Sequence, residues 1–320
     1  MLVIMKSAIL IYNTQAGRGK IGRNVDHIVA IFRNAGYDMR PRLIAFGENP
    51  FDGYETVDLA VVAGGDGTLN YVVNAMKRKG LSLTLGVIPA GTANDFAGAL
   101  GMSRNILKAA QQIAEGVVEQ IDCGKVEQIG RGRDKHPDKD IYFVNIFSFG
   151  LFTTTSQHTS EHLKHRIGRL AYVVAAMRDL RNLHSIPLTI TTDNETFYYQ
   201  TLMGLVFNGE TAGRVPLASK SSLRDGVFDC LFLRRRNLIL SVFDMVLYIL
   251  GIKTPAIRFL RTSTLVLATC IDEDTDVDGQ RGGEFPMRVV CLHGELNVVC
   301  PQDRDTVSYT HLRAHETKAN

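Results

Sequence analysis

The sequence predicts a two-domain α/β protein, with a doubly wound parallel sheet in the N-terminal domain and an antiparallel β sandwich in the C-terminal domain. Its length of 320 residues suits about two domains of roughly 100–200 residues each. Strand-like apolar runs alternate with helical patterns over residues 1–121, whereas short β-rich runs separated by turns fill residues 122–301. We expect residues 302–320 to be a disordered or non-native tail, because they show no apolar periodicity.

In the N-terminal domain, strand-like apolar runs alternate with helical patterns. Strands are expected at residues 7–13, 58–64 and 83–90, and helical patterns within 21–32, 69–79 and 91–101. Gly80 and Gly101 follow the second and third helical patterns, as expected of helix ends. This alternation predicts a parallel sheet with helices on both faces.

The C-terminal domain is predicted to be mostly β structure. Its strands are expected within residues 141–150, 186–193, 196–209, 226–235, 264–270 and 285–300, with helical patterns at 162–183 and 238–252. The charged segment 130–140 is predicted to be a solvated hairpin loop.

The composition excludes several classes of protein. The formal net charge is only +3, so no global basic surface favours nucleic-acid binding. Five cysteines are scattered without a C-x-x-C pair, which indicates a reducing, cytoplasmic compartment. The longest apolar stretch, residues 238–252, contains Asp244 and is too short to span a bilayer.

The first glycine-rich stretch, GRGKIG at residues 17–22, matches the dinucleotide fingerprint G-x-G-x-x-G, with Asp38 about twenty residues later. Residues 13–16 separate it from the preceding strand, whereas that fingerprint follows its strand directly. Arg18 and Lys20 suit phosphate better than they suit NAD packing. We therefore favour a basic lid over phosphates, with a flexible first turn as the alternative.

Two further glycine loops, GGDGT at residues 64–68 and PAGTANDFA at 89–97, each follow an expected strand and open an expected helix. In an open α/β sheet such loops meet at the carboxyl ends of the strands, where ligands bind. Backbone N–H groups at a helix N-terminus favour phosphate. Taken alone, GGDG is equally consistent with a tight turn in which Asp66 caps a helix. Since G-x-x-x-x-G-K-[ST] does not occur, the chain is not a P-loop NTPase.

GGDGTLN together with GVIPAGTANDFA resembles the catalytic domain of bacterial diacylglycerol-kinase-like lipid kinases. Sphingosine and ceramide kinases share that domain, and NAD kinases and phosphofructokinases share the outline of its fold. The resemblance extends from about Ala8 to about Pro301 and includes SSLRDGVFD and the late segment DVDGQRGGEFP. It implies an ATP- and Mg²⁺-dependent kinase that phosphorylates a lipid hydroxyl.

The resemblance also implies roles for individual residues. The residues implied for ATP are Asn13, Gly17, Gly64, Gly65, Asp66, Gly67, Thr68, Leu69, Asn70, Gly91, Thr92, Asn94 and Asp95. A structural Mg²⁺ is expected on Asp225 and on the backbone carbonyls of Ser222 and Val227. The residues alone favour a hairpin turn at Asp225-Gly226. Asp66 is expected to orient Mg²⁺ or the substrate hydroxyl.

The late motif departs from the family pattern. It usually reads D-G-E, with the Glu as the proposed general base, whereas this chain has Asp278-Gly279-Gln280. An amide does not accept a proton at neutral pH, so either Asp278 or Asp66 takes the role, or the base is dispensable, or activity is low. The catalytic candidates are therefore Asp66, Asp278 and Gln280.

The expected partners are ATP, a lipid substrate and, peripherally, a membrane surface, while a homodimer stays open. The helical pattern at 162–183 has basic residues beside an apolar stripe. It is either a membrane-surface helix or, by a slight preference, a helix packed on the β domain. The same alternatives apply to residues 238–252, which Lys253, Arg258 and Arg261 follow. Two other functions stay open: a NAD-kinase-like kinase of a small molecule, and a weakly active nucleotide- or lipid-binding regulator, which Gln280 motivates.

Overall fold

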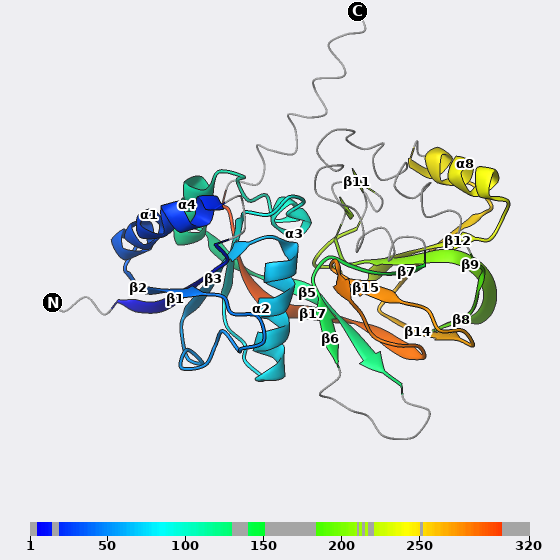
Figure 1. Cartoon of the computed structure of the whole chain (residues 1–320), viewed down its shortest axis with the longest axis horizontal. Coiled ribbons are helices and arrows are strands. Elements are labelled where there is room, and N and C mark those ends of the chain that lie inside the picture. Colours follow the sequence, from blue (N-terminus) through cyan, green and yellow to red (C-terminus); the bar gives the residue numbers. More distant parts are fainter. Residues whose placement is uncertain are drawn as a thin grey trace, which may run out of the picture. The chain divides into compact units, whose positions relative to one another are not determined.

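The computed structural model describes residues 5–14, 19–129, 140–150, 184–209, 211–212, 215–216, 221–249 and 252–302. The chain divides into two units, Met1–Ile121 with Leu296–Asn320, and Asp122–Glu295 (Figure 1). Gly17, the helical pattern at 162–183 and the tail from residue 303 lie outside the described residues.

The first unit is built on a parallel sheet. Its elements are β1 (Lys6–Tyr12), α1 (Lys20–Asn34), β2 (Tyr37–Leu43), β3 (Leu59–Gly64), α2 (Asp66–Arg78), β4 (Leu85–Pro89), α3 (Asp95–Ala99) and α4 (Ile106–Ala114). The strand order is β4-β3-β1-β2, and every pair in it is parallel. The end of β17 (Met287–Cys300) pairs in parallel with β4 at Val298, so the chain returns to the unit in which it began.

The connections of this sheet run in opposite directions from its middle. The crossover through α1 leads from β1 outward to β2, and the crossover through α2 leads from β3 the other way to β4. Since such crossovers are right-handed, they place α1 and α2 on opposite faces of the sheet, as Figure 1 shows. The predicted doubly wound sheet is confirmed, and its switch point lies between β1 and β3.

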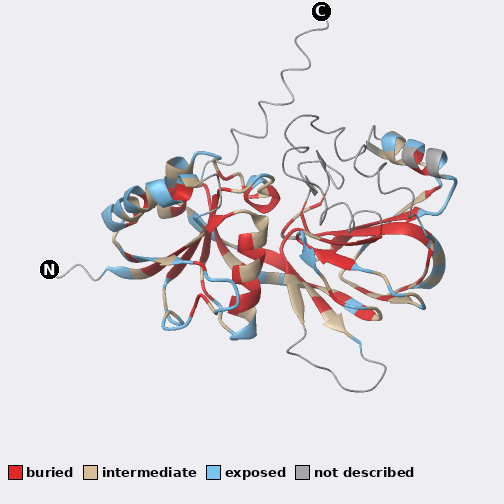
Figure 2. Cartoon of the chain, in the orientation of Figure 1, coloured by how far each residue is buried: buried red, intermediate tan, exposed pale blue. Residues whose placement is uncertain are grey.

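Strands β3 and β4 form the centre of the core of the first unit. Every residue of both strands is buried, as Figure 2 shows in red. Strands covered on both faces have unbroken apolar sequences, and LAVVAG and LGVIP follow this rule. The ends of these strands are therefore fixed in position by the core below them.

The second unit is antiparallel β structure, as predicted. Its elements are β5 (Val117–Gln128), β6 (Ile141–Phe143), β7 (Ile146–Gly150), β8 (Ile186–Thr192), β9 (Thr196–Phe207), β10 (Thr211–Ala212), β11 (Val215–Pro216), β12 (Phe228–Arg234), α8 (Leu238–Ile249), β13 (Ile257–Thr262), β14 (Thr264–Thr269), β15 (Thr275–Val277), β16 (Gln280–Arg281) and the first part of β17. Strand β9 lies at its centre, paired with β7, β8 and β12. Strands β5 and β6 pair antiparallel, and most of the predicted loop between them, residues 130–139, lies outside the described part.

Phenylalanine side chains fill the core of the second unit. Phe143 stacks on Phe228 with ring centroids 5.4 Å apart, and Phe149 contacts Phe232. A Cβ on Gly124 would lie 2.1 Å from the Phe143 ring, so this strand needs a glycine beneath the ring. Close packing of rings against backbone thus fixes the strands relative to one another within this unit.

Several elements were not predicted from the sequence, among them β2, α4, β5, β13 and β15. Strand β2 is an edge strand that pairs only with β1, and most of its residues are at least partly exposed. Pro41 and the charged residues around it obscure the apolar pattern, although an edge strand tolerates both. Helix α4 begins at Asn105, whose side-chain oxygen accepts hydrogen bonds from the N–H groups of Leu107 and Lys108.

The Asp278-Gly279 turn between β15 and β16 anchors the start of β7. Both residues have positive φ, 51° and 85°, as a two-residue type I′ hairpin turn requires. The Asp278 carboxylate accepts hydrogen bonds from the backbone N–H groups of Val144, Asn145 and Ile146 at 2.8–3.0 Å. This carboxylate therefore holds together two segments that are more than 130 residues apart in the sequence.

We expect Asp278→Ala to lower the free energy of unfolding by about 3 kcal/mol, because two buried N–H groups and one partly buried N–H group lose a charged acceptor. Asp278→Asn keeps one acceptor oxygen and tolerates the positive φ, so its loss should be smaller. Urea unfolding followed by circular dichroism gives both values. Asp274→Ala is the exposed control and should change stability by less than about 0.5 kcal/mol. A stability of Asp278→Ala equal to that of this control would contradict the anchor.

Candidate functional site

The two predicted glycine loops begin side by side at the carboxyl ends of neighbouring strands. Gly64 at the end of β3 is paired with Pro89 at the end of β4. Just beyond, the N–H of Ala90 donates a hydrogen bond to the carbonyl oxygen of Gly64 at 2.8 Å. Asn13, which follows β1, donates its N–H to the carbonyl oxygen of Ala63 at 3.3 Å. Three strand ends, including the switch point, therefore meet at one edge of the sheet.

The two loops touch through glycine backbone. A Cβ on Gly91 would lie 2.5 Å from the Cα of Gly65, and a Cβ on Gly65 would lie 3.0 Å from the Cα of Gly91. Gly64 is also confined, because a Cβ there would lie 2.5 Å from the Cβ of Thr68. Contacts under 3.0 Å are not found for real Cβ atoms, so glycine is required where the loops meet.

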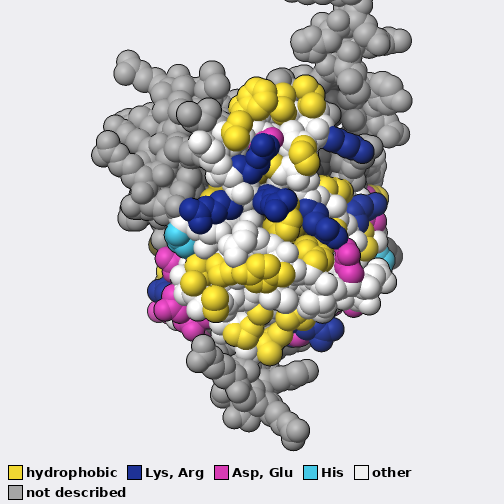
Figure 3. All heavy atoms as spheres, turned by 90° about the vertical axis from the view of Figure 1, so that its right-hand side faces the viewer, with side chains coloured by type: hydrophobic (Ala, Val, Ile, Leu, Met, Phe, Trp, Pro, Cys, Tyr) yellow, Lys and Arg dark blue, Asp and Glu magenta, His cyan; other side chains and the backbone are white. Residues whose placement is uncertain are grey.

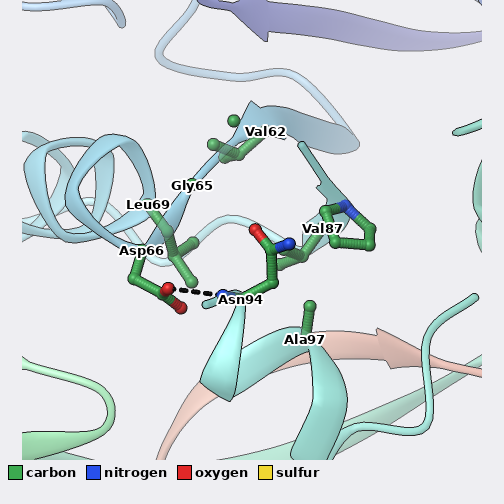
Figure 4. A pocket seen from close by; sticks show the side chains of 9 residues that line it. Val62, Gly65, Asp66, Leu69, Val87, Asn94 and Ala97 are labelled. Carbon is green, nitrogen blue, oxygen red and sulfur yellow. Dashed lines mark hydrogen bonds between the residues drawn. The ribbon is translucent and has the colours of Figure 1, made fainter. Parts of the chain in front are cut away.

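Asp66 and Asn94 connect the loop at residues 89–97 to the loop at residues 64–68. The backbone N–H of Asn94 donates to Asp66 Oδ2 at 2.7 Å, drawn as the dashed line in Figure 4. The Asn94 side chain closes its own loop, since Oδ1 accepts from the Gly91 N–H at 2.7 Å and Nδ2 donates to the Gly91 carbonyl at 2.8 Å. Asn94 has a φ of 54°, a left-handed conformation that asparagine tolerates better than most residues.

Among the described residues, no side-chain cation pairs with Asp66. Burial raises the pKa of this carboxyl, and the neighbouring Asp95 carboxylate raises it further, while hydrogen bonds from the Asn94 and Phe96 backbone oppose the shift. Asp66 also lies in the first turn of α2, where the helix dipole favours negative charge. A proton or a cation at this position would relieve the repulsion between Asp66 and Asp95.

A small hollow lies beside these residues, and Figure 4 shows Asp66 and Asn94 at its edge. It is lined by Val62, Gly64, Gly65, Asp66, Leu69, Val87, Pro89, Asn94 and Ala97. Most of this lining is apolar side chain or glycine backbone. Its polar groups come from the two loops, as expected for a site in which few polar groups orient a ligand.

The other predicted ATP residues differ in their accessibility. Gly67 is partly exposed and Thr92 is exposed. Thr68 and Asn70 are buried, at 6% and 5% exposure, and Asn70 accepts a hydrogen bond from Asn74 within α2. We therefore regard Asn70 as a residue that supports the helix. Gly17 is not among the described residues.

The residues predicted for a structural Mg²⁺ lie around the turn before β12, where the side chains of Asp225 and Ser222 have partners. The Asp225 carboxylate forms an ion pair with Arg261, and its other oxygen accepts the N–H of Val227 at 3.3 Å. Ser222 Oγ accepts the N–H of Arg224 at 3.2 Å. A guanidinium already neutralises the predicted ligand, and the described residues contain no cluster of three or more His, Cys, Asp or Glu suited to a metal.

Asp122 was missed by the sequence reasoning. Its fully buried carboxylate accepts the N–H groups of Gly226 and Gly294 at 2.7 and 2.8 Å and contacts His293 Nδ1 at 2.8 Å. It fixes the Asp225-Gly226 turn that the sequence singled out. A lone acid within the otherwise apolar IDCG is the only sequence signal of this role.

The late motif contributes an anchored acid and an exposed amide. Asp278 is 8% exposed, and backbone N–H groups occupy its oxygens, as described above. Gln280 is exposed on β16. Of the acids predicted to be catalytic, Asp66 lies beside the glycine loops and Asp278 lies in the second unit.

Comparison with known proteins agrees with this arrangement. Residues 7–126 match the diacylglycerol kinase catalytic domain, and residues 146–300 match the YegS C-terminal NAD kinase beta sandwich-like domain. A Bacillus subtilis (strain 168) protein named diacylglycerol kinase is 33% identical over 309 residues, which cover 94% of this chain and 98% of that protein. A protein of the same name from Staphylococcus aureus (strain bovine RF122 / ET3-1) is 30% identical over 320 residues, covering 96% and 97%.

A solved structure supports the fold. The crystal structure of a diacylglycerol kinase from Bacillus anthracis str. Sterne superimposes with a TM-score of 0.70 at 21% identity, covering 93% of this chain and 97% of that one. Both predicted folds are therefore confirmed. Because the relationship to the B. subtilis protein spans nearly all of both sequences, this chain belongs to the diacylglycerol kinase family of lipid kinases.

Proposed function

We propose that this chain is an ATP- and Mg²⁺-dependent kinase that transfers the γ-phosphate of ATP to the hydroxyl group of diacylglycerol. The observation that carries the proposal is the pair of glycine loops locked together around an acid at the N-terminus of α2. The choice of acceptor is supported by the names of the relatives from B. subtilis and S. aureus.

The fit to ATP rests on backbone donors. Helix α2 begins at Asp66 after Gly65, which has no side chain to cap the helix. The N–H groups of the first turn, from Asp66 to Thr68, are thus suited to phosphate oxygens. Since Gly65 and Gly91 carry no side chain, the loop at residues 89–97 packs against the residue that precedes this first turn.

The chemistry of the acids supports a cation beside Asp66. Its pKa is raised by burial and by Asp95, so its ionised form lacks compensating positive charge. Bound with ATP, Mg²⁺ neutralises charge on the phosphates. Asp225 has no part in this proposal, because Arg261 already pairs with its carboxylate.

Asp66 is also the residue we assign to receive the proton of the acceptor hydroxyl. A carboxylate whose pKa is raised toward neutrality is a better base than an ordinary one. Asp278 is a poorer choice, since three backbone N–H groups hold its carboxylate, whereas Asp66 lies beside the glycine loops. Phosphoryl transfer depends mainly on positioning and charge, and a general base adds about 10²–10⁴-fold, so Gln280 is compatible with activity.

The test is transfer of label from γ-labelled ATP, with Mg²⁺, to diacylglycerol in mixed micelles and, in a parallel reaction, to NAD. Label in the lipid alone is expected. Label in NAD alone would identify a small-molecule kinase. ATP binding without label in either acceptor would identify a regulator, and either of these results would refute the proposal.

Gly91→Ala should weaken ATP binding, because its Cβ would push the two loops apart. Overpacking costs typically about 1–3 kcal/mol, which corresponds to about 5–150-fold in affinity. Gly98→Ala in α3 is the matched control, since nothing lies within 4 Å of its added Cβ. Calorimetric titration with ATP and Mg²⁺ compares the two variants, and equal affinities would count against the glycine contact as part of the site.

Asp66→Asn should lower kcat by about 10²–10⁴-fold and yet leave the protein folded, since the amide oxygen still accepts the Asn94 N–H. Because the folded-state pKa of Asp66 is raised, the ionised carboxylate costs stability above its unfolded pKa, and this cost disappears as the pH falls. The Tm of Asp66→Asn at neutral pH should therefore equal or exceed that of the wild type, with the difference closing toward about pH 4. Near-normal turnover would remove Asp66 from the mechanism.

A further inference from the structure

Helix α8 in the second unit buries two polar residues on its inward face, beside Met245 and Tyr248, and exposes apolar residues on its outward face. Ser241 and Asp244 are buried, at 4% and 3% exposure. Leu240, Phe243 and Val246, which recur at every third position, are exposed at 43%, 56% and 37%. A helix on an ordinary surface shows the reverse arrangement, since its apolar stripe faces the core.

The inward face of α8 is firmly seated, so this orientation is built into the unit. Met245 and Tyr248 pack on a cluster of buried residues on β9 and β12 that includes Met203 and Leu231. Asp244 Oδ2 lies 3.0 Å from Nη1 of Arg236, so the buried acid is paired. Rotating the helix to hide Phe243 would break that pair and expose the packed side.

The apolar face continues beyond the helix. Ile252, which follows α8, is 50% exposed, and Phe259 on edge strand β13 is 46% exposed. We call these two residues, with Leu240, Phe243 and Val246, the α8 surface. Scattered exposed apolar residues are normal, but a grouped set on one helix face and its neighbour indicates a contact surface.

Cations border this surface. Arg234 and Arg235 precede α8 and Lys253 follows it, and all three are exposed. Within the part of the chain that the structure describes, none of the three forms an ion pair. Figure 3 shows hydrophobic side chains gathered over α8 and a row of Lys and Arg side chains directly beneath them.

The cations beside the α8 surface favour an anionic bilayer over a second copy of the chain as its partner. A second copy of the chain, related by twofold symmetry, would bring the same unpaired cations together. An anionic bilayer offers an apolar interior for the α8 surface and phosphates for the exposed Arg235 and Lys253. No helix among the described residues is long and apolar enough to cross a bilayer, so contact through this helix would be confined to the membrane surface.

We propose that the α8 surface and its bordering cations dock this protein on an anionic lipid bilayer. The proposal rests on the proposed function in one respect only, that the acceptor is a membrane lipid. The dock keeps the enzyme on the membrane, where a diacylglycerol substrate is concentrated.

The test is co-sedimentation with vesicles of phosphatidylcholine containing phosphatidylglycerol, compared with phosphatidylcholine alone. The wild type should bind the anionic vesicles. Leu240→Ser with Phe243→Ser should weaken binding by at least about tenfold, because two exposed apolar groups no longer insert. Arg235→Gln with Lys253→Gln should also weaken binding and reduce its dependence on salt. Val118→Ser and Arg40→Gln, exposed residues of the first unit, are the controls and should bind as the wild type does.

Activity toward a short-chain diacylglycerol dissolved below its micelle concentration separates this proposal from the proposed function. All variants should phosphorylate that soluble substrate at the wild-type rate. If no diacylglycerol is phosphorylated but vesicle binding still depends on the α8 surface, the proposed function is refuted and membrane binding through α8 is supported. Membrane binding through α8 would be refuted if the wild-type protein did not bind anionic vesicles, or if the α8 variants bound them as well as the controls do. It would also be refuted if the protein formed a dimer without lipid and Phe243→Ser dissociated that dimer but left vesicle binding unchanged. The α8 surface would then be a contact between two copies of the chain.

Discussion

The contact between Gly65 and Gly91 is the constraint on which the candidate site depends. Two loops that follow neighbouring strands approach until their α-carbons leave no room for a Cβ. Only glycine permits this approach, and it brings the start of α2 beside the loop that precedes α3. The buried strands β3 and β4 hold both loops from below. A site for phosphate thus arises from backbone placement, with few side chains involved.

The acid in the first loop is explained by the same geometry. Asp66 accepts a hydrogen bond from the Asn94 N–H and so holds the loop at residues 89–97 against the loop at residues 64–68. Burial and the neighbouring Asp95 make this position electrostatically costly, which the raised pKa of Asp66 reflects. Asp66 at the start of α2 and Asp95 at the start of α3 crowd two carboxylates together, which favours a positive charge between them. A metal–nucleotide complex supplies such a charge, while its phosphates occupy the N–H donors of α2.

Much of this arrangement could be predicted from the sequence, because strand–glycine–helix patterns are local and parallel strands place such loops together. The side-chain partners that lie far apart in the sequence could not be predicted in this way. The sequence did not indicate that Asp225 pairs with Arg261 on β13. Asp278 resembled a catalytic acid, but its three backbone donors lie in a segment that no local pattern connects to it. Strand β2 was hidden because edge strands tolerate Pro41 and charge.

The most direct test of the account is a crystal structure with a non-hydrolysable ATP analogue and Mg²⁺. The account predicts phosphate oxygens within hydrogen-bonding distance of the first-turn N–H groups of α2, against the Gly65–Gly91 contact, with the metal near Asp66. Phosphates bound away from these loops, with Gly65 and Gly91 uninvolved, would contradict it.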